Sequence, residues 1–216
     1  MKKIYTALGL MSGKSGDGVD ASIISTNGID QYSEISNKYF KYDQKIYENL
    51  HKLRDKIFKF DDLKKNEKEI NFLEREVTLF HAMVVKEISK TIDRKVDFIG
   101  FHGQTIYHNP PEKISKQIGD GKLLSQLTKK NVVYNFRQND INNGGEGAPL
   151  TPIFHRQIVK QKKIELPVCI LNIGGIANVT AIDDYEKESF FSRDLGPGNC
   201  LIDQWIRNKT NNKFDK

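Results

Sequence analysis

The stretch from Gly9 to Asp20, GLMSGKSGDGVD, combines glycines with lysine, hydroxyl and carboxylate side chains, which are groups that handle phosphate. Gly13-Lys14-Ser15 matches the end of a Walker A loop, whose backbone N–H groups surround a phosphate. The spacing is wrong, because that loop needs four residues between its glycines, and only three separate Gly9 from Gly13. The residues that follow alternate as a strand does, whereas a Walker loop enters a helix. We therefore interpret this stretch as a glycine-rich turn between two strands.

A second candidate site is the sequence RDLGPGNCLIDQW. Asp194 is expected to end a strand, and Asn199 is placed to cap a helix that begins near Cys200. A carboxylate held beside a helix amino terminus is suited to act as a general base next to a bound phosphate. The alternative is an ordinary turn aspartate.

Further polar groups follow a strand expected over 96–103. His102, Gln104 and Thr105 place hydrogen-bonding groups at its carboxyl end, where α/β proteins present chemistry, and they suit a polyhydroxylated ligand. Arg137 in FRQNDI is a bidentate donor for a carboxylate. Asp140 is close enough to be its ion-pair partner instead, so the sequence leaves a salt bridge and a ligand contact equally open.

The elements that position these residues are predicted by hydrophobic periodicity. Strands over 4–10, 19–25 and 33–42 form an antiparallel meander, with a hairpin signal at Asn27-Gly28. The region 44–93 is helical, and apolar residues at steps of three and four predict a long helix over 70–92, with His81 packed beside the stripe. Later strands are expected over 132–136, 167–175, 176–183 and 189–196. A glycine-rich loop over 139–152 leads to a helix through about Lys162, and a last helix spans 200–207.

Gly174-Gly175 repeats the plan of the first turn, since each turn lies between the first two strands of a three-strand meander. This repetition predicts a duplicated α/β architecture and resembles the actin-like sugar kinases, in which two hairpin turns approach a nucleotide from opposite sides of a cleft. We expect a first lobe over 1–163 and the start of a second, incomplete lobe over 164–216.

The composition narrows the classes of function. The 216 residues carry a net charge of +6, but the lysines are mixed with Asp and Glu and form no basic stripe, which argues against a nucleic-acid partner. No apolar run approaches the ~20 residues that span a membrane, and no signal peptide is present, so a cytoplasmic location is expected. Cys169 and Cys200 lie far apart, which suggests neither a zinc pair nor a disulfide.

The order of the motifs resembles the anhydro-N-acetylmuramic acid kinase family from about Leu8 almost to the last residue. The matching stretches are GLMSGKSGDGVDAS, GFHGQTIYHNP, QIGD, NFRQNDINNGGEGAPLTPIFHR, LNIGGIANVT and DLGPGNCLIDQW. The resemblance implies the actin-like fold of sugar kinases, Hsp70 and actin, with a ribonuclease H-like core, the first domain complete and the second truncated. It also implies a cytoplasmic enzyme of cell-wall recycling, commonly a homodimer.

By this resemblance, the reaction takes 1,6-anhydro-N-acetylmuramic acid, ATP and water, with Mg²⁺. It opens the anhydro bridge and phosphorylates O6, giving N-acetylmuramic acid 6-phosphate. The catalytic base corresponds to Asp194. The ATP phosphates would be bound by Gly13, Lys14, Ser15, Gly16, Asp17, Gly18, Val19, Asp20, Gly174 and Gly175, with Asp17 supporting the metal through water. The sugar would be bound by His102, Gln104, Thr105, Arg137, Gly196 and Asn199.

Three departures from the family pattern matter. Lys14 stands where the family has Thr, and Leu195 replaces the Thr of Asp-Thr-Gly-Pro-Gly-Asn. The chain is also shorter than family members, so we expect a fragment with an exposed sheet face in its second lobe. Two alternatives to the kinase stay open: a non-catalytic remnant that binds anhydro-sugar or a partner, and a Walker-type NTPase.

Overall fold

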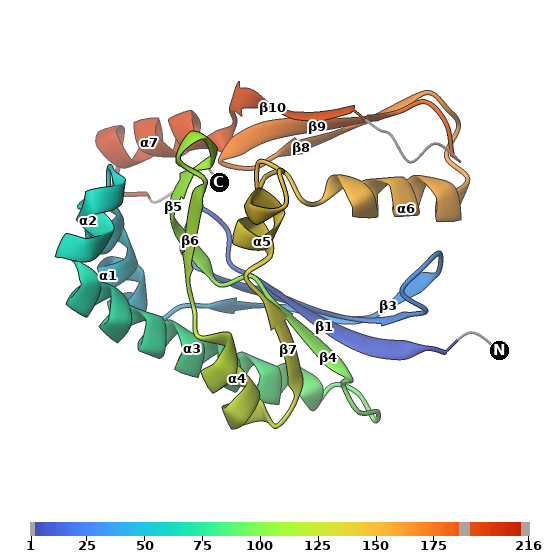
Figure 1. Ribbon diagram of the computed structural model, residues 1–216, viewed down its shortest axis with the longest axis horizontal. Helices are drawn as coiled ribbons and strands as arrows, with labels where there is room; N and C mark the ends of the chain where they lie inside the picture. Colours follow the sequence, from blue (N-terminus) through green and yellow to red (C-terminus); the bar gives the residue numbers. More distant parts are fainter. Residues whose placement is uncertain (1–2, 186–190, 213–216) are drawn as a thin grey trace. The chain divides into compact units, whose positions relative to one another are not determined.

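The computed structural model describes residues 3–185 and 191–212, which belong to two compact units, Met1–Gly147 and Ala148–Lys216 (Figure 1). The helix expected to end near Lys162 belongs to the second unit. The boundary between functional lobes at residues 163 and 164 stays a prediction. Each unit is described below by itself.

The first unit is built on a five-stranded mixed sheet with the strand order β3-β2-β1-β4-β7. The first three strands are antiparallel to one another, and β4 and β7 run parallel to β1. This order is that of a ribonuclease H-like core, so the predicted α/β, actin-like fold is confirmed. The strands are β1 (Tyr5–Met11), β2 (Gly18–Thr26), β3 (Tyr32–Lys41), β4 (Phe98–Phe101) and β7 (Asn131–Tyr134).

The direction of the strands decides where the polar groups gather. Because β1, β4 and β7 are parallel, their carboxyl ends lie along one edge of the sheet. The glycine-rich turn follows β1, His102 follows β4, and Asn135 follows β7. Three stretches that are far apart in sequence are therefore brought to one edge.

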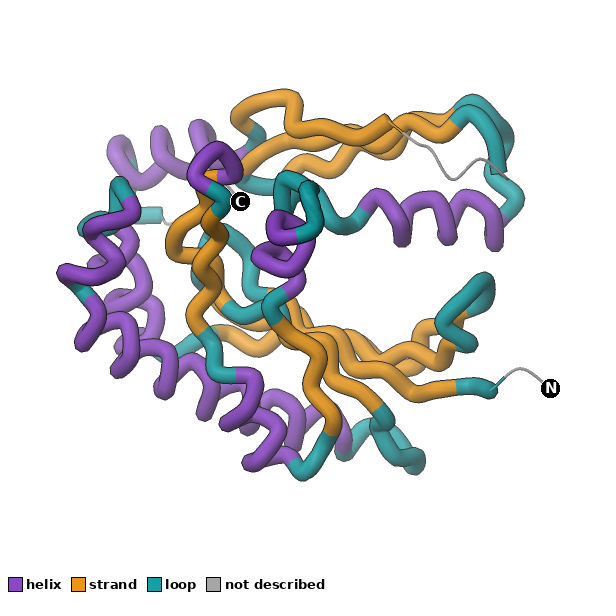
Figure 2. The backbone as a smooth tube through the Cα atoms, in the orientation of Figure 1, coloured by secondary structure: helices purple, strands orange, loops and turns teal. Residues whose placement is uncertain are grey.

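Helices cover one face of this sheet, as Figures 1 and 2 show. The long helix predicted over 70–92 is confirmed as α3 (Glu67–Ser89), whose apolar stripe is buried, and His81 is fully buried with it. The other helices of this unit are α1 (Gln44–Arg54), α2 (Phe60–Lys65), α4 (Gly121–Thr128) and α5 (Phe136–Asn142).

Two parts of the first unit differ from the sequence prediction. Residues 104–118 form a two-stranded sheet of β5 (Gln104–Asn109) and β6 (Ile114–Ile118), joined through a 3-10 turn at Pro110–Glu112. The loop predicted from residue 139 was wrong at its start, because residues 139–142 belong to α5. The buried side chain of Ile141 anchors α5. Asn135 has a left-handed backbone conformation, which turns the chain from β7 into α5.

The second unit repeats the three-strand meander, as predicted. Its sheet has the order β10-β9-β8, and both pairs of neighbours are antiparallel. Its elements are α6 (Pro152–Lys162), β8 (Val168–Ile173), β9 (Ile176–Ile182), β10 (Phe191–Pro197) and α7 (Asn199–Lys209). The first two residues of the strand predicted over 189–196 lie outside the described residues.

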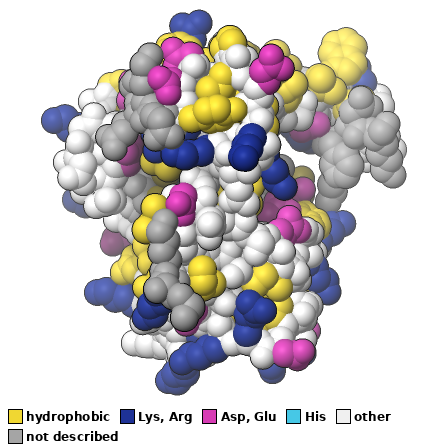
Figure 3. Space-filling model, turned by 90° about the vertical axis from the view of Figure 1, so that its right-hand side faces the viewer, with side chains coloured by type: hydrophobic (Ala, Val, Ile, Leu, Met, Phe, Trp, Pro, Cys, Tyr) yellow, Lys and Arg dark blue, Asp and Glu magenta, His cyan; other side chains and the backbone are white. Residues whose placement is uncertain are grey.

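Large apolar side chains of the second unit are exposed. Leu171 and Ile173 on β8 are 54% and 55% exposed, and Trp205 on α7 is 64% exposed. An exposed sheet face was the expectation from the sequence. In the face drawn in Figure 3, Lys and Arg side chains are interspersed with Asp and Glu rather than gathered. Of the helices described, none is long and apolar enough to cross a membrane.

Candidate functional site

The glycine-rich turn joins β1 to β2, which confirms the strand-turn-strand prediction. The N–H of Gly16 donates to the carbonyl of Gly13 over 3.1 Å, and the φ of Gly16 is 65°, a left-handed conformation that favours glycine. Any side chain at Gly18 would clash with the carbonyl of Phe40 and the hydroxyl of Tyr39. Glycine is therefore required at Gly18 by close packing and favoured at Gly16 by backbone conformation.

The start of the turn is anchored in the core by Ser12, Tyr42 and His81, all of which are buried. The Oγ of Ser12 lies 2.8 Å from the hydroxyl of Tyr42 and 3.3 Å from Nε2 of His81, whose Nδ1 lies 2.7 Å from the carbonyl of Val77. A carbonyl only accepts, so Nδ1 carries the proton and Nε2 is the acceptor. Ser12 therefore donates to His81 and accepts from Tyr42, which fixes the direction of every hydrogen bond in the anchor.

His81 stays neutral in this anchor. Burial lowers its pKa from the ordinary value of 6.5 to about 4, the Val77 hydrogen bond opposes that shift, and the nearby His102 adds to it. A protonated ring would lose its acceptor for Ser12, so the low pKa keeps the anchor intact at neutral pH.

Three consecutive carbonyls of the turn are held by side chains from elsewhere in the first unit. Gln104 Nε2 donates to the carbonyl of Gly13 over 2.9 Å, Arg54 donates to that of Lys14, and His51 Nε2 lies 3.0 Å from that of Ser15. The C=O and N–H of one trans peptide point in opposite directions. The N–H groups of Lys14 and Ser15 therefore point away from these partners, as an anion-binding turn requires.

Carboxylates lie close to this turn. The hydroxyl of Ser15 donates to Asp17, and both burial and the negative charge of Asp17 raise the pKa of Asp20. Among the described residues, no group of three or more His, Cys, Asp or Glu is placed to hold a metal ion. Mg²⁺ bound by phosphates, water and one or two carboxylates needs no such cage. A cation would offset the electrostatic repulsion between Asp17 and Asp20, which is compatible with the metal-supporting role predicted for Asp17.

His102 and Arg137, both predicted to bind sugar, contact each other. Arg137 Nε donates to His102 Nε2 over 2.8 Å, and Arg137 Nη1 donates to the carbonyl of Gly147 over 2.7 Å. His102 Nδ1 lies 2.6 Å from the carbonyl of Gly103 and so carries the proton. Burial, followed by the charge of Arg137, lowers the pKa of His102 to about 4. The imidazole is therefore a neutral acceptor for the guanidinium.

Asp140 and Arg137 hold the same residue from its two sides. Asp140 Oδ2 accepts from the N–H of Gly147 over 2.8 Å, whereas Arg137 binds the carbonyl of that residue. The sequence left a salt bridge and a ligand contact open for Arg137. Arg137 donates to a ring nitrogen of His102 and to the backbone carbonyl of Gly147. A contact between Arg137 and a ligand stays a prediction.

The other two residues predicted after β4 contact protein groups. Gln104 has no exposed surface and reaches Gly13 in the turn, and Thr105 Oγ1 accepts from Gln117 Nε2 over 3.3 Å. Gln104 is thus placed to position the glycine-rich turn, and Thr105 is placed to support Gln117. Their predicted contacts with a sugar stay predictions.

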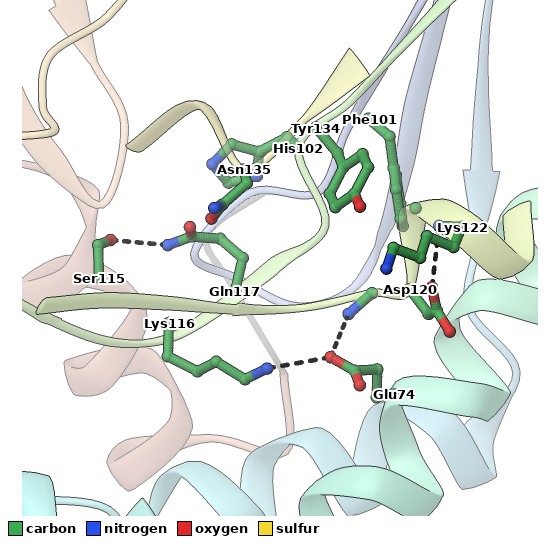
Figure 4. Close-up of a pocket in the computed structure, with 12 residues that line it drawn as sticks. Glu74, Phe101, His102, Ser115, Lys116, Gln117, Asp120, Lys122, Tyr134 and Asn135 are labelled. Carbon is green, nitrogen blue, oxygen red and sulfur yellow. Dashed lines mark hydrogen bonds and ion pairs between the residues drawn. The ribbon is translucent and has the colours of Figure 1, made fainter. Parts of the chain in front are cut away.

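A cavity of about 310 Å³ lies within the first unit at the carboxyl edge of β4 and β7 (Figure 4). Among the predicted sugar residues, only His102 lines it. The remaining lining comes from α3, the end of β4, β6, the loop before α4, α4 and the end of β7. Much of it is polar: Glu74, Phe101, Ser115, Lys116, Gln117, Gly119, Asp120, Gly121, Lys122, Tyr134 and Asn135. Part of this lining comes from the QIGD motif, and part from the motifs GFHGQT and NFRQND.

In the second unit, the two glycine segments are joined by hydrogen bonds. The N–H of Asn199 donates to the carbonyl of Gly174 over 2.7 Å, and that of Gly198 donates to Gly175 over 3.0 Å. A side chain at Gly198 would clash with the carbonyl of Gly174. The loop after Asp194 is therefore tied to the predicted second phosphate turn.

Two local predictions around Asp194 were wrong. Asp194 does not end its strand, because β10 continues to Pro197 through a β-bulge between Asp194 and Gly196. Asn199 is not the cap of α7 but its first residue, and its side chain donates to the carbonyl of Ile173 over 3.2 Å. The bulge leaves Asp194 exposed opposite Asn178 of β9.

The structure thus groups the predicted residues by unit. In the first unit, Gly13 of the turn contacts Gln104, and His102 contacts Arg137. In the second unit, Gly174 and Gly175 contact Asn199 and Gly198 of the loop after Asp194. The sequence did not predict that Tyr42 and His81 anchor the turn, because nothing in their local pattern distinguishes them from ordinary packed side chains. It also missed Lys122 and Tyr134, which carry no motif.

Comparison with known proteins gives one consistent family. The family model described as anhydro-N-acetylmuramic acid kinase matches residues 5–216. A protein of that description from Pelagibacter ubique (strain HTCC1062) is 61% identical over 216 residues, covering 100% of this chain and 58% of the relative. One from Agrobacterium fabrum (strain C58 / ATCC 33970) is 39% identical over 221 residues, covering 100% of this chain and 59% of the relative.

The chain therefore spans under two thirds of the length of these relatives. Among solved structures, an exopolyphosphatase-like protein matches with a TM-score of 0.44 and 12% identity, over 96% of this chain and 59% of that one. That likeness is too distant to bear on function.

Proposed function

The chain belongs to the anhydro-N-acetylmuramic acid kinase family, and from this premise we propose that it carries the phosphate turn, the sugar-binding residues and the catalytic base of an ATP-dependent sugar kinase. The reaction opens the 1,6-anhydro ring of anhydro-N-acetylmuramic acid and phosphorylates O6, giving N-acetylmuramic acid 6-phosphate. The observation that carries the proposal is the turn over 13–18, whose carbonyls are occupied by Gln104, Arg54 and His51.

The turn acts on the phosphates of ATP. Its outward N–H groups at Lys14 and Ser15 bind phosphate oxygens, and the ammonium of Lys14 adds a positive charge where the family has a hydroxyl. Mg²⁺, when bound, offsets charge that develops on the phosphates, with Asp17 as its supporting carboxylate through water. Gly174 and Gly175 form the corresponding turn of the second unit.

Asp194 is the proposed general base. It accepts a proton from water as the water oxygen bonds to C1 of the sugar. The C1–O6 bond breaks, and O6 leaves with the electron pair of that bond. O6 then bonds to the γ-phosphorus of ATP while the bond from that phosphorus to the bridging oxygen of ADP breaks. An exposed carboxylate on a bulged strand next to glycine turns suits this role, since it is accessible to water and to a sugar.

The test measures product formation by mass spectrometry with the anhydro-sugar, ATP and Mg²⁺. The 216-residue chain is assayed in parallel with the longer Pelagibacter ubique relative. Asp194→Asn, and the same change at the aligned residue of the relative, is expected to lower turnover by ~10²–10⁴-fold, the usual contribution of a general base. Glu165→Gln is the matched control for charge loss in the second unit, and we expect it to leave turnover unchanged.

The outcomes distinguish a catalytic kinase from a non-catalytic sugar-binding remnant. Turnover that survives Asp194→Asn would contradict the assignment of the base. Sugar binding by this chain without phosphoryl transfer, while the relative is active, would favour the non-catalytic sugar-binding remnant.

A further inference from the structure

Of the three side chains that hold carbonyls of the glycine-rich turn, Gln104 is the one that is fully buried. His51 and Arg54 reach the turn from α1 and are half-buried, so water competes for the hydrogen bonds that they make. Gln104 has no exposed surface, and its Nε2 donates to the carbonyl of Gly13 over 2.9 Å. Solvent therefore cannot replace the contact between Gln104 and the turn.

The backbone that carries Gln104 is held on both sides. The chain continues alongside β1 beyond the end of β4, since the N–H of His102 donates to the carbonyl of Leu10 over 3.2 Å. Gln104 itself is paired with Ile118 of β6. Gly103, between His102 and Gln104, has a φ of 70°, and a side chain there would clash with the carbonyl of Ile118. The amide of Gln104 thus reaches the turn from a backbone with little freedom to move.

The contact leaves one polar atom of Gln104 unsatisfied. Its Oε1 is buried and, in the part of the chain that the structure describes, accepts no hydrogen bond. The carbonyl of Gly13 also accepts from the N–H of Gly16 over 3.1 Å, so it keeps a partner without Gln104. A buried acceptor without a partner lowers stability and calls for an explanation in function. Stability alone therefore does not account for a glutamine at this position.

The orientation of one peptide group supplies that explanation. The carbonyl of Gly13 and the N–H of Lys14 belong to the same trans peptide and point in opposite directions. A carbonyl accepts over a broad range of directions, so the single hydrogen bond from Gly16 leaves this peptide room to tilt. The second donor, Gln104, narrows that range. The N–H of Lys14 is thereby held facing away from Gln104, ready to donate to an anion.

We propose that Gln104 is a positioning residue for the phosphates of the nucleotide, and that the fold gives up stability to keep it there. Gln104 acts through the peptide between Gly13 and Lys14 and touches no ligand itself. The inference rests on the proposed function, because it takes the turn to be the phosphate site of the kinase. It assigns Gln104 to the nucleotide, although the motif GFHGQT that contains this residue was predicted to bind sugar.

The experiment follows backbone amides by NMR while the chain is titrated with inorganic tripolyphosphate, which carries the phosphates of ATP without its nucleoside. The Lys14 and Ser15 amides of the unsubstituted chain are expected to shift together and to give one Kd. Gln104→Met introduces an apolar side chain of similar size and is expected to raise that Kd by ~5–10-fold, the effect of about one hydrogen bond.

Urea unfolding separates this role from a structural one. The urea midpoint of Gln104→Met is expected to be unchanged or higher, because the unpaired Oε1 is removed and Gly13 keeps its bond from Gly16. A structural role predicts the opposite pattern, a lower midpoint with an unchanged Kd. Gln126→Met removes an exposed glutamine from α4 and is the matched control, which should change neither quantity.

Three results overturn the inference: no shift of the Lys14 and Ser15 amides in the unsubstituted chain, an equal Kd in Gln104→Met, or a Gln104→Met chain that is less stable or does not fold. Failure of the proposed function looks different. Absence of phosphoryl transfer in both the chain and its longer relative, with Gln104-dependent binding of tripolyphosphate intact, would overturn the kinase and leave Gln104 as the positioning residue of a phosphate site.

Discussion

The Nε of Arg137 donates to the Nε2 of His102 over 2.8 Å, and the opposite ring nitrogen of His102 lies 2.6 Å from the carbonyl of Gly103. The imidazole is thereby held in one tautomer, with its proton on Nδ1 and its acceptor facing a permanent positive charge. Both residues were predicted to contact a sugar, and the structure makes each a neighbour of the other.

Replacing Arg137 by Gln tests this relationship. The charge of Arg137 is the second cause, after burial, of the low pKa of His102. Arg137→Gln is therefore expected to raise the pKa of His102 from about 4 toward the ordinary 6.5, measured by NMR titration of the ring. Arg75→Gln, which removes an exposed arginine from α3, is the control and should leave the titration unchanged. An unchanged pKa of His102 in Arg137→Gln would contradict the assignment of Arg137 as a cause.

Acid is expected to weaken the fold through the two buried imidazoles. His81 and His102 both have a folded-state pKa of about 4 against an ordinary 6.5. Between these values the unfolded chain binds protons on both rings and the folded chain does not. The contribution of each ring is therefore complete above pH 6.5 and falls as the pH drops toward 4, by up to ~1.4 kcal/mol per pH unit.

Urea unfolding at pH 7, 5.5 and 4.5 measures this loss. His81→Gln should flatten the dependence by about one proton, while lowering the free energy of unfolding at pH 7 because the Ser12 anchor is disturbed. The same slope in the variant and in the unsubstituted chain would rule out His81 as a source of the pH dependence.

The anchor of the glycine-rich turn is tested at Ser12. Ser12→Ala leaves the Tyr42 hydroxyl and His81 Nε2 buried without their shared partner. The free energy of unfolding is expected to fall by ~2–4 kcal/mol, since a buried group without its hydrogen bond costs ~1–3 kcal/mol. Tyr42→Phe removes only the donor, and Ser12 still donates to His81, so its cost should be ~1 kcal/mol. Equal losses in the two variants would argue against the proposed hydrogen-bond directions.

Close packing at Gly18 makes a further prediction. Gly18→Ala places a methyl group against the Phe40 carbonyl and the Tyr39 hydroxyl, so β2 or β3 must shift. The expected loss in unfolding free energy is ~1–3 kcal/mol, typical of overpacking. Gly9→Ala is the matched control on β1, because its methyl would meet only the Ser22 carbonyl at 3.9 Å. An unchanged free energy of unfolding in Gly18→Ala would contradict the predicted clash with Phe40 and Tyr39.

Much of the secondary structure followed from periodicity. The meander of β1, β2 and β3, the helix α3 and the repeated meander of the second unit were predicted, because alternation and steps of three and four are local properties of the chain. The helix α5 was missed, since its residues read as loop and its start depends on the left-handed Asn135. The predicted strand end at Asp194 was wrong because a β-bulge, unlike a turn, has no characteristic amino-acid composition that marks it in the sequence.

The sequence by itself determined the α/β class, the strand-turn-strand nature of the glycine segment and the family, because these depend on residue types and their spacing along the chain. Only the tertiary structure decided which side chains meet. Ser12 and His81 are 69 residues apart in the sequence, and Gly13 and Gln104 are 91 residues apart. Such contacts depend on sheet register and on helix packing, which the spacing of residues along the chain does not predict. The same holds for the cavity, where parallel strands and α4 bring Lys122, Gln117 and Tyr134 to a single site.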